Sequence, residues 1–266
     1  MPAAERLAGL PGAAAVPATV PLPAPSAPRL RVLTLNLHKG FSALGQRDVL
    51  HDIRLAVRQV NADVVFLQEV MGVASEAGRS QYEFLADSIW DDHAYGRNAV
   101  SSLGHHGNAV LSRYPITQWR NHDISVPHRE PRGLLQCSLA IPGYPRPLHA
   151  FCVHLGLREA ERRWQLHALA DLLLPIRAWG EPVVVAGDFN DWRHVGHQHL
   201  LAQTALQEVH QLAHGHLART FPARWPVLAL DRIYVANTLD QHPLLLPNQP
   251  WARLSDHAPL AAEITL

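Results

Sequence analysis

Polar residues of metal-binding and proton-transferring types stand at the ends of six apolar segments in this chain of 266 residues. In the stretch VVVAGDFND, residues 183–191, an apolar run leads directly into Asp188 and Asn190. The other five segments carry Asn36, Glu69, His154, Asp231 and the neighbours Asp256 and His257. Oxygen donors from Asp, Glu and Asn suit Mg²⁺ or Mn²⁺ and suit zinc poorly. A hard cation beside two histidines and an aspartate predicts hydrolysis of a phosphate ester, because the metal neutralises charge while a base activates water.

Each of these residues also has a simpler structural explanation when it is taken alone. A carboxylate at a strand end usually caps a helix or forms a turn, and a single histidine usually fills a hydrogen-bonded core position. The six segments together favour a site, because strand ends at one edge of a sheet converge in space. The pair His105 and His106 is interpreted as a loop or rim feature, since adjacent residues of a strand point apart.

The elements that would position these residues follow from the apolar patterns. Strands are predicted over residues 30–38, 63–70, 106–112, 133–141, 147–155, 181–190, 228–237 and 257–266. Helices are predicted over residues 47–60, 81–90, 158–179 and 197–212, where apolar residues recur at helical spacing. The strands are too many and the crossover helices too few for a regular βαβ barrel. Two packed sheets with helices outside are therefore expected.

Composition limits the class of protein. A hydrophobic content of 47% suits one large α/β or α+β domain or two small ones. Because no interior linker interrupts the chain, we expect one domain over residues 30–266. Residues 1–29 are rich in Ala and Pro and are predicted to form a disordered tail. Lys+Arg and Asp+Glu both number 23, so a broad basic face for long duplex nucleic acid is not indicated.

Two further observations bear on location. No run approaches 18 consecutive apolar residues, so no membrane span is predicted. Cys137 and Cys152 lie in strand-like segments and are expected to be buried free thiols in a reducing compartment. A reducing compartment without a membrane span implies a cytoplasmic protein. We also expect the protein to be a monomer.

Seven sequence blocks carry a resemblance to a known family. In chain order they are LTLNLHKG, DVVFLQEV, GNAVLSRYPI, CVHLGLREAERRWQ, VVVAGDFND, LDRIYV and LSDHAPL. The chain resembles the endonuclease/exonuclease/phosphatase family, a metal-dependent phosphoesterase group related to DNase I, from about residue 31 to 266. The strings LHKGF and GHHGNAVLSRYPI further resemble a bacterial subgroup of YbhP type. The resemblance implies a four-layer α/β sandwich, in which two mostly antiparallel β-sheets are flanked by helices.

The resemblance also implies a role for each site residue. Glu69, Asn36 and Asp256 match the family's metal-binding positions, which implies Mg²⁺ or Mn²⁺ as the cofactor. Asp188 matches the aspartate that orients or deprotonates the attacking water. His257 matches a histidine that acts either as general base or as phosphate stabiliser, and the resemblance does not decide between the two.

Further residues are implied to support that histidine or to contact the substrate. Asp231 matches the aspartate that hydrogen-bonds the histidine, which would fix its tautomer. His154 and Asn190 match residues that contact the phosphate, and Asn108 in the GNAVLSRYPI block is expected to bind substrate. Arg162 stands three residues before Gln165 on the predicted helix and would bind substrate, anchor the loop after His154, or pair with an acid there.

Several readings of the function stay open. The substrate that the resemblance implies is a phosphate ester, belonging either to a nucleic acid or to a phospholipid or inositol headgroup. A strip of Arg113, Arg120, Arg129 and Arg132 would hold a phosphate backbone, or the four are scattered surface residues. Phe221 and Trp225 would stack on a base or only fill a loop. A protein of another class, a non-catalytic binding protein on the same scaffold, is the alternative to an enzyme.

Overall fold

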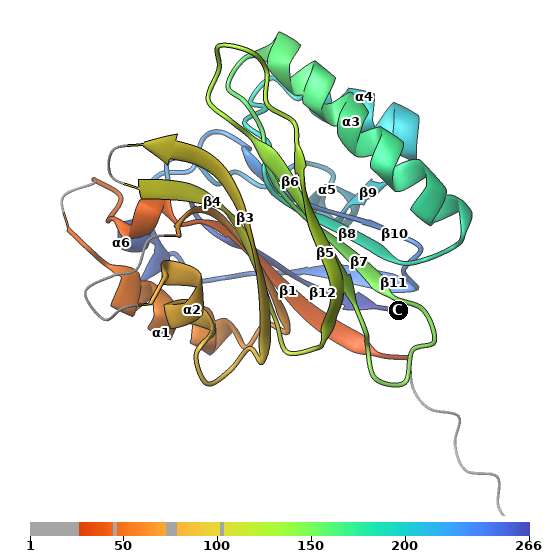
Figure 1. Cartoon of the computed structure of the whole chain (residues 1–266), viewed down its shortest axis with the longest axis horizontal. Coiled ribbons are helices and arrows are strands. Elements are labelled where there is room, and N and C mark those ends of the chain that lie inside the picture. The colour runs from red at the N-terminus through yellow and green to blue at the C-terminus, as the bar shows by residue number, and fades with distance from the viewer. Residues whose placement is uncertain (1–26, 45–46, 73–78, 102–103) are drawn as a thin grey trace, which may run out of the picture.

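The computed structural model describes residues 27–44, 47–72, 79–101 and 104–266, and these ranges form two β-sheets packed face to face (Figure 1). In the first sheet the strands lie in the order β11 (Asp240–Leu244), β12 (Leu260–Thr265), β1 (Arg29–Asn36), β2 (Val64–Met71), β4 (Gly104–Ser112) and β3 (Asp92–Ser101). In the second they lie in the order β5 (Ile116–Asp123), β6 (Gly133–Leu139), β7 (Leu148–His154), β8 (Val183–Asp188), β10 (Asp231–Ala236) and β9 (Gln207–Glu208). Within these described sheets, only the pairs β1–β2 and β7–β8 are parallel.

Helices cover the outer faces of both sheets (Figure 1). The first sheet carries α1 (Leu50–Val60), α2 (Gln81–Ala86), α6 (Trp251–Leu254) and the 3₁₀ helix η1 (His38–Gly40). The second carries α3 (Glu159–Ala178) and α4 (Val195–Thr204), while α5 (Val209–His214) contacts β10 and β11 at the sheet edge. The predicted four-layer α/β sandwich is therefore confirmed.

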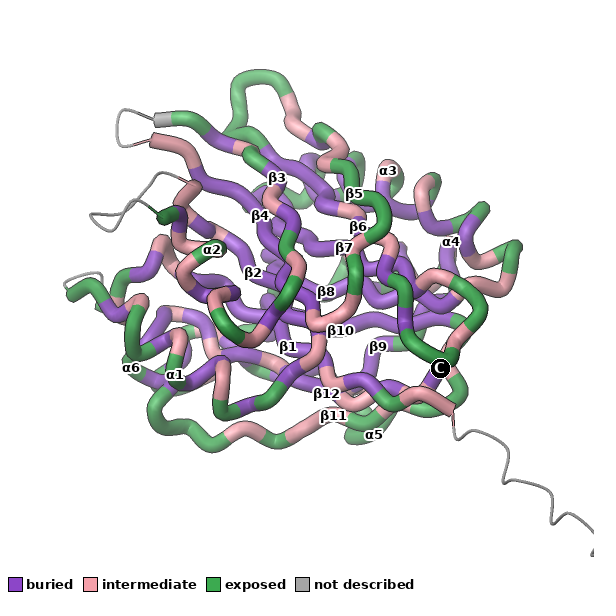
Figure 2. Tube along the Cα trace, turned by 60° about the horizontal axis from the view of Figure 1, so that its bottom comes forward, coloured by how far each residue is buried: buried purple, intermediate pink, exposed green. Residues whose placement is uncertain are grey.

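Three apolar layers hold these elements together, and the buried strands at the centre of Figure 2 mark them. Ala186 and Cys152 belong to the layer between the two sheets. Leu33 packs with α1 on the outer face of the first sheet, and Val185 packs with α3 on the outer face of the second. Because side chains alternate between the faces of a strand, each central strand supplies both an inner and an outer layer.

All eight interior strands were predicted from the sequence, whereas β3, β5, β9 and β11 were not. These four are the edge strands of the two sheets. An edge strand is buried on fewer sides, and β5 is almost entirely exposed or half-buried, so it lacks the apolar run that marks an interior strand. The helix predicted over residues 197–212 is instead two helices, α4 and α5, separated by Ala205 in a left-handed conformation and by β9.

The remaining predictions concern the termini and the thiols. Most of the predicted tail, residues 1–26, lies outside the described residues, and β1 begins at Arg29. Both cysteines are buried and free, as predicted. No helix in the described part of the chain is long and apolar enough to cross a membrane.

Candidate active site

Polar side chains continue the layer between the sheets at one end of the sandwich. Ala186 of β8 faces this layer, and Asp188 lies two residues further along the same strand face. In β7 the same relation holds between Cys152 and His154. Three further residues stand on the inter-sheet face of their strands by the same alternation: Asn36 in β1, Asn108 in β4 and Asp231 in β10.

Strand register brings these residues side by side. His154 is paired with Asp188 in the parallel β7–β8 ladder, and Asp231 is paired with Asp188 in the antiparallel β8–β10 ladder. Gly187 makes the close approach of the strands possible, because a Cβ there would lie 1.9 Å from the carbonyl oxygen of Val153. In the sequence Gly187–Asp188 at the end of β8, the glycine is therefore required by the packing of the backbone, and the aspartate supplies the chemistry.

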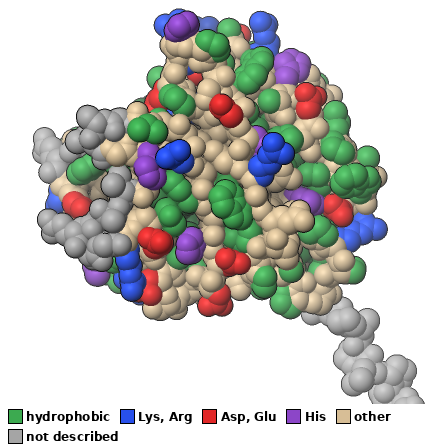
Figure 3. Space-filling model, viewed as in Figure 1, with side chains coloured by type: hydrophobic (Ala, Val, Ile, Leu, Met, Phe, Trp, Pro, Cys, Tyr) green, Lys and Arg blue, Asp and Glu red, His purple; other side chains and the backbone are tan. Residues whose placement is uncertain are grey.

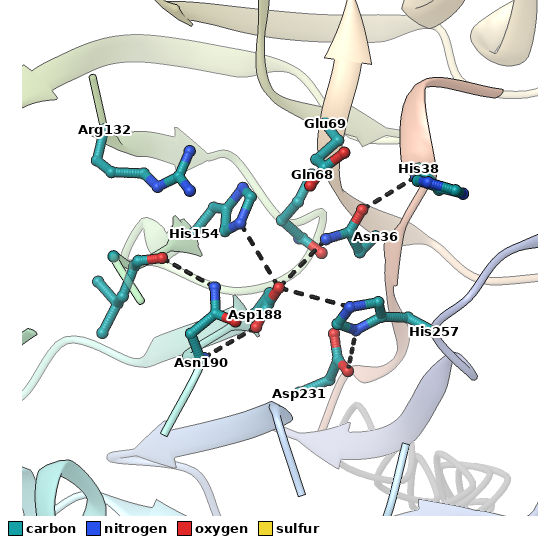
Figure 4. A network of polar contacts seen from close by, with 12 residues as sticks. Asn36, His38, Gln68, Glu69, Arg132, His154, Asp188, Asn190, Asp231 and His257 are labelled. Atoms are coloured by element: carbon teal, nitrogen blue, oxygen red, sulfur yellow. Dashed lines mark hydrogen bonds and ion pairs between the residues drawn. The ribbon is translucent and has the colours of Figure 1, made fainter. Parts of the chain in front are cut away.

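Asp188 is the centre of the group (Figure 4). Its Oδ2 accepts a hydrogen bond from Nδ2 of Asn36 at 3.2 Å, and its Oδ1 accepts one from the backbone N–H of Asn190 at 2.9 Å. Nε2 of His154 lies 3.6 Å from Oδ2, and Nε2 of His257 lies 3.8 Å from the same atom. All five side chains are buried, so the contacts form away from bulk water.

His257 is held on the other side by Asp231. Nδ1 of His257 lies 2.8 Å from Oδ2 of Asp231, and the ring of Phe221 lies 5.0 Å from the imidazole, centroid to centroid. The backbone N–H of His257 donates to Oγ of Ser255, whose hydroxyl donates to the carbonyl oxygen of Asn36 at 2.7 Å. These contacts tie the loop before β12 to the end of β1 and fix which ring nitrogen faces Asp188.

Burial and neighbouring charges shift three pKa values in this group. Burial raises the pKa of Asp188 to about 7, although the positive charge on His257 opposes the rise. Burial lowers the pKa of His257, but Asp231 and Asp188 outweigh it and bring that pKa to about 10. Burial, and then the charge of Arg132, holds the pKa of His154 well below its ordinary value. A neutral His154 and a cationic His257 therefore face one carboxyl group.

The two remaining predicted acids, Glu69 and Asp256, lie at the edge of the group. Glu69 has a φ of 53° at the point where the register of β2 shifts, and this bulge turns its side chain out of the strand alternation. Its carboxylate lies 3.9 Å from Nζ of Lys39, and that of Asp256 lies 3.9 Å from Nδ1 of His38. Both carboxylates are partly exposed, and neither has a direct contact with Asp188 among the described interactions.

Two candidate cation positions follow from these acids. Asp188, Asp231 and His257 present ligand atoms within 4.8 Å of one another. Nδ1 of His257 is, however, in a short hydrogen bond with Asp231, and its pKa of about 10 keeps the ring protonated, so neither ring nitrogen has a lone pair for a metal. The carboxylates of Glu69 and Asp256 are partly exposed, and they offer only the oxygen atoms that Mg²⁺ and Mn²⁺ prefer.

Two predicted substrate-binding residues are engaged elsewhere. Nδ2 of Asn108 donates to the carbonyl oxygens of Gly133 and Cys152, which joins the two sheets. The Nη1 group of Arg162 donates to the carbonyl oxygens of Gly156 and Leu157, in the loop after His154. Substrate binding by Asn108 and Arg162 stays a prediction, and these contacts favour an anchoring role for both.

Two residues beside the group, Gln68 and Arg132, were not among the predicted site residues. Gln68 is fully buried on the inter-sheet face of β2, where its Nε2 contacts Thr34 and Cys152. Strand alternation would have found it. Arg132 was predicted either to hold a phosphate backbone within a strip of arginines or to be one of several scattered surface residues, but its side chain is only 6% exposed and lies beside His154 (Figure 4). Arg120 and Arg129 are exposed, whereas Arg132 is buried, so Arg132 is not part of an exposed strip with them.

Comparison with known proteins fits the ordered sequence blocks. Residues 33–257 match the model of the Endonuclease/Exonuclease/phosphatase family. This chain belongs to that family. It is 53% identical over 244 residues to the protein YbhP of Escherichia coli strain K12, a match that covers 89% of this chain and 96% of YbhP. YbhP of Shigella flexneri matches to the same extent. The resemblance to the family and to its YbhP-type subgroup is thus confirmed.

Solved structures show the same fold at low sequence identity. An endonuclease/exonuclease/phosphatase from Beutenbergia cavernae aligns with a TM-score of 0.72 and 20% identity, over 90% of this chain and 72% of that chain. Truncated TDP2 from Caenorhabditis elegans aligns with a TM-score of 0.67 and 17% identity, over 90% of this chain and 98% of that chain. The family includes metal-dependent phosphoesterases, which act on phosphate esters.

Proposed function

We propose that this chain hydrolyses a phosphodiester or phosphomonoester by in-line attack of an activated water, with Mg²⁺ or Mn²⁺ as cofactor. The observation that carries the proposal is the contact of buried Asp188 with Asn36, His154, Asn190 and His257. A carboxyl group buried without an Arg or Lys partner costs free energy of folding, so a structural role accounts for it poorly. Such groups concentrate at sites where protons are transferred.

Glu69, Asn36 and Asp256 would hold the metal. The chemistry of this donor set fits a hard cation, because all three residues offer oxygen atoms. The contacts also fit, since the carboxylate of Glu69 lies 3.9 Å from Nζ of Lys39, and a bound cation would replace this long ion pair. When bound, the metal would neutralise charge on the phosphate and make water easier to deprotonate.

Asp188 would take the proton from the attacking water, while His257 would act as a cation. His257 lies between two carboxylates, with Asp231 at 2.8 Å and Asp188 at 3.8 Å, and this geometry favours the imidazolium. His154 and Asn190 would donate to phosphoryl oxygens. The Nδ2 group of Asn190 donates to the carbonyl oxygen of Leu155, and its second proton is left for substrate.

The substrate is either a nucleic acid or a phospholipid headgroup, and one observation favours the former. Trp225 is 74% exposed and carries the guanidinium of Arg224 over its ring at 5.4 Å, which suits base stacking. Phe221 instead packs on His257. On the face shown in Figure 3, basic side chains lie scattered among acidic and apolar ones, so a long duplex has no continuous basic track there.

An activity panel in Mg²⁺ tests the proposal. It would contain abasic duplex, single-stranded DNA, RNA, phosphoinositides and a generic phosphodiester, with His257→Ala as the blank. We expect turnover of at least one substrate, its loss in chelator, and its loss in the variant. Binding to a nucleic acid should weaken steeply as salt rises, whereas binding of a single headgroup should weaken little. Equal turnover by the wild type and the His257→Ala variant would remove the basis of the proposal.

A further inference from the structure

Arg132 is a buried cation whose surroundings do not account for its burial. Its side chain is 6% exposed, and its Nε is buried with no hydrogen-bond partner. Its ion-pair partner is Glu130, whose Oε2 lies 2.9 Å from Nη2, but the side chain of Glu130 is 49% exposed. Figure 4 shows the guanidinium beside the imidazole of His154, on the side of the site away from His38. The arginine therefore lies inside while its partner lies at the rim.

The backbone holds Arg132 rigidly in this place. Its N–H donates to Oγ of Ser125 at 3.1 Å, and its carbonyl oxygen accepts from the N–H of Ile124 at 3.1 Å. The next residue, Gly133, is packed against the side-chain amides of Asn98 and Asn121, since a Cβ there would lie 2.2 Å from Oδ1 of Asn98. A clamped backbone reduces the entropy lost when the guanidinium binds a ligand.

Glu130 bridges Arg132 to a histidine on the other sheet. Its Oε1 lies 3.5 Å from Nε2 of His106, a buried residue of β4, while its Oε2 contacts Arg132. His106, and then Arg132, keep the pKa of Glu130 at about 2, so the bridging group is an anion. Two side chains, one from β4 and one from the segment just before β6, thus converge on one oxyanion, which is the arrangement that a phosphate group requires.

We propose that Arg132 and His106 form an anion subsite for the phosphoryl group of the substrate, and that Glu130 occupies this subsite until substrate displaces it. The inference rests on the proposed hydrolysis of a phosphate ester. The planar guanidinium suits two phosphoryl oxygens at once, and Nε supplies a donor that nothing in the described protein uses. Because Glu130 is half exposed, it can turn into solvent without being buried as an unpaired charge.

A purely structural ion pair predicts different behaviour from a subsite. If the pair served only to hold the fold, loss of either charge would destabilise the protein and leave phosphate affinity alone. In the subsite, loss of Arg132 removes a donor, whereas loss of the Glu130 charge removes a competitor. The two substitutions should therefore change phosphate affinity in opposite directions.

The test is titration calorimetry of inorganic phosphate into the full-length protein saturated with Mg²⁺. Arg132→Gln should weaken binding about 10- to 100-fold, as expected for a lost charge-assisted hydrogen bond. Glu130→Gln should tighten it by about two- to fivefold, because the competing anion is gone. The matched control is Arg129→Gln, an exposed arginine of the same segment, which should stay within about twofold of the wild type.

Wild-type affinity in Arg132→Gln would overturn the subsite, and so would weaker binding in Glu130→Gln. If Arg132→Gln does not fold, the Glu130→Gln variant decides alone: tighter phosphate binding than in the wild type supports the subsite, and equal or weaker binding contradicts it. Turnover of bis(p-nitrophenyl) phosphate, which has a single phosphate, should fall in kcat/KM in Arg132→Gln and recover in part in Arg132→Lys. Phosphate binding decides the subsite even if the wild type turns over no substrate, so failure of the proposed function would be seen separately.

Discussion

Two aspartates three positions apart, Asp188 and Asp191, are both fully buried and have opposite surroundings. Asp191 is paired with Arg232, whose Nη1 lies 3.0 Å from its Oδ2 and whose Nη2 donates to its carbonyl oxygen at 2.7 Å. The backbone N–H of His197 donates to the same carboxylate at 2.8 Å. Asp188 has no Arg or Lys partner among the described residues, and its ionisable partners are His154 and His257.

The difference separates a structural acid from a chemical one. An arginine keeps its proton throughout the accessible pH range, so the charge on Asp191 is compensated permanently. Asp188 instead has a pKa of about 7 and only histidines as its ionisable partners, so its own charge can change during a reaction near neutral pH. Burial is the same at both positions, and the kind of partner is what distinguishes them.

The largest expected effect is on turnover, in the comparison of Asp188→Asn with Asp191→Asn. Asp188→Asn should lower kcat by about 10³-fold or more, because the group that accepts the proton is lost. Its melting temperature in chelator should not fall, since burial already raises the pKa of Asp188 and favours the uncharged form. Steady-state kinetics beside thermal melts measure both. If Asp188→Asn retained its turnover, Asp188 would have a structural role like that of Asp191 and no role in proton transfer.

Asp191→Asn should act on stability instead. Removing one partner of a buried ion pair leaves Arg232 with an uncompensated charge, which costs about 3–5 kcal/mol of the free energy of unfolding. Urea titration followed by circular dichroism would measure this loss. The matched control is Asp240→Asn on the edge strand β11, which is exposed and should change the free energy by less than about 0.5 kcal/mol. If both variants unfold alike, the Asp191–Arg232 pair does not hold the fold.

A smaller effect is expected from Asp231→Asn, which keeps the shape of the side chain and removes its charge. His257 would lose the neighbour that raises its pKa, so the imidazolium would deprotonate at lower pH. We expect kcat/KM to fall about 10- to 100-fold and its high-pH limb to move toward lower pH. A pH–rate profile tests this shift. An unmoved limb would show that the protonated form of His257 is not required.

The smallest effect is a pH dependence of stability from His197, beside the Asp191–Arg232 pair. Burial, and then the charge of Arg232, lowers its pKa from 6.5 to about 4. Between these values the unfolded chain binds a proton that the folded chain does not, so stability falls as pH drops from 6.5 toward 4. The loss should reach about 1 to 2 kcal/mol by about pH 5. Urea titrations at several pH values should show a shallower dependence in His197→Asn than in the wild type.

Much of this arrangement was predictable from the sequence, because it depends on apolar runs. Each interior strand is buried on both faces and reads as such a run, and the polar residue at its end is then conspicuous. Asn36, His154, Asp188 and Asp231 were identified in this way, and the structure brings them together with His257. Family resemblance supplied the roles, which the runs alone do not specify.

What the sequence did not predict depends on single-residue geometry. The edge strands have a neighbouring strand on one side only and are less buried than the interior strands. Their sequences therefore lack the apolar run by which the interior strands were predicted. The bulge at Glu69 shifts the inward–outward alternation of side chains in β2 by one position, and the spacing of apolar residues in the sequence does not reveal such a shift. Arg132 precedes β6 in a polar segment with Arg129 and Glu130, and only the fold shows that its side chain turns inward. Asp191 was similarly indistinguishable from Asp188, because its partner Arg232 is far away in the chain.

The most direct measurement is hydrolysis of the substrate panel as Mg²⁺ is titrated into metal-free protein, with wild type, Asp188→Asn and Asp191→Asn in parallel. The account predicts turnover that rises and saturates with Mg²⁺ in the wild type and is absent in Asp188→Asn. It predicts that Asp191→Asn, measured at a temperature where it stays folded, keeps most of that turnover. Binding of a phosphate ester without turnover in wild type and Asp188→Asn alike would identify a binding protein and contradict the account.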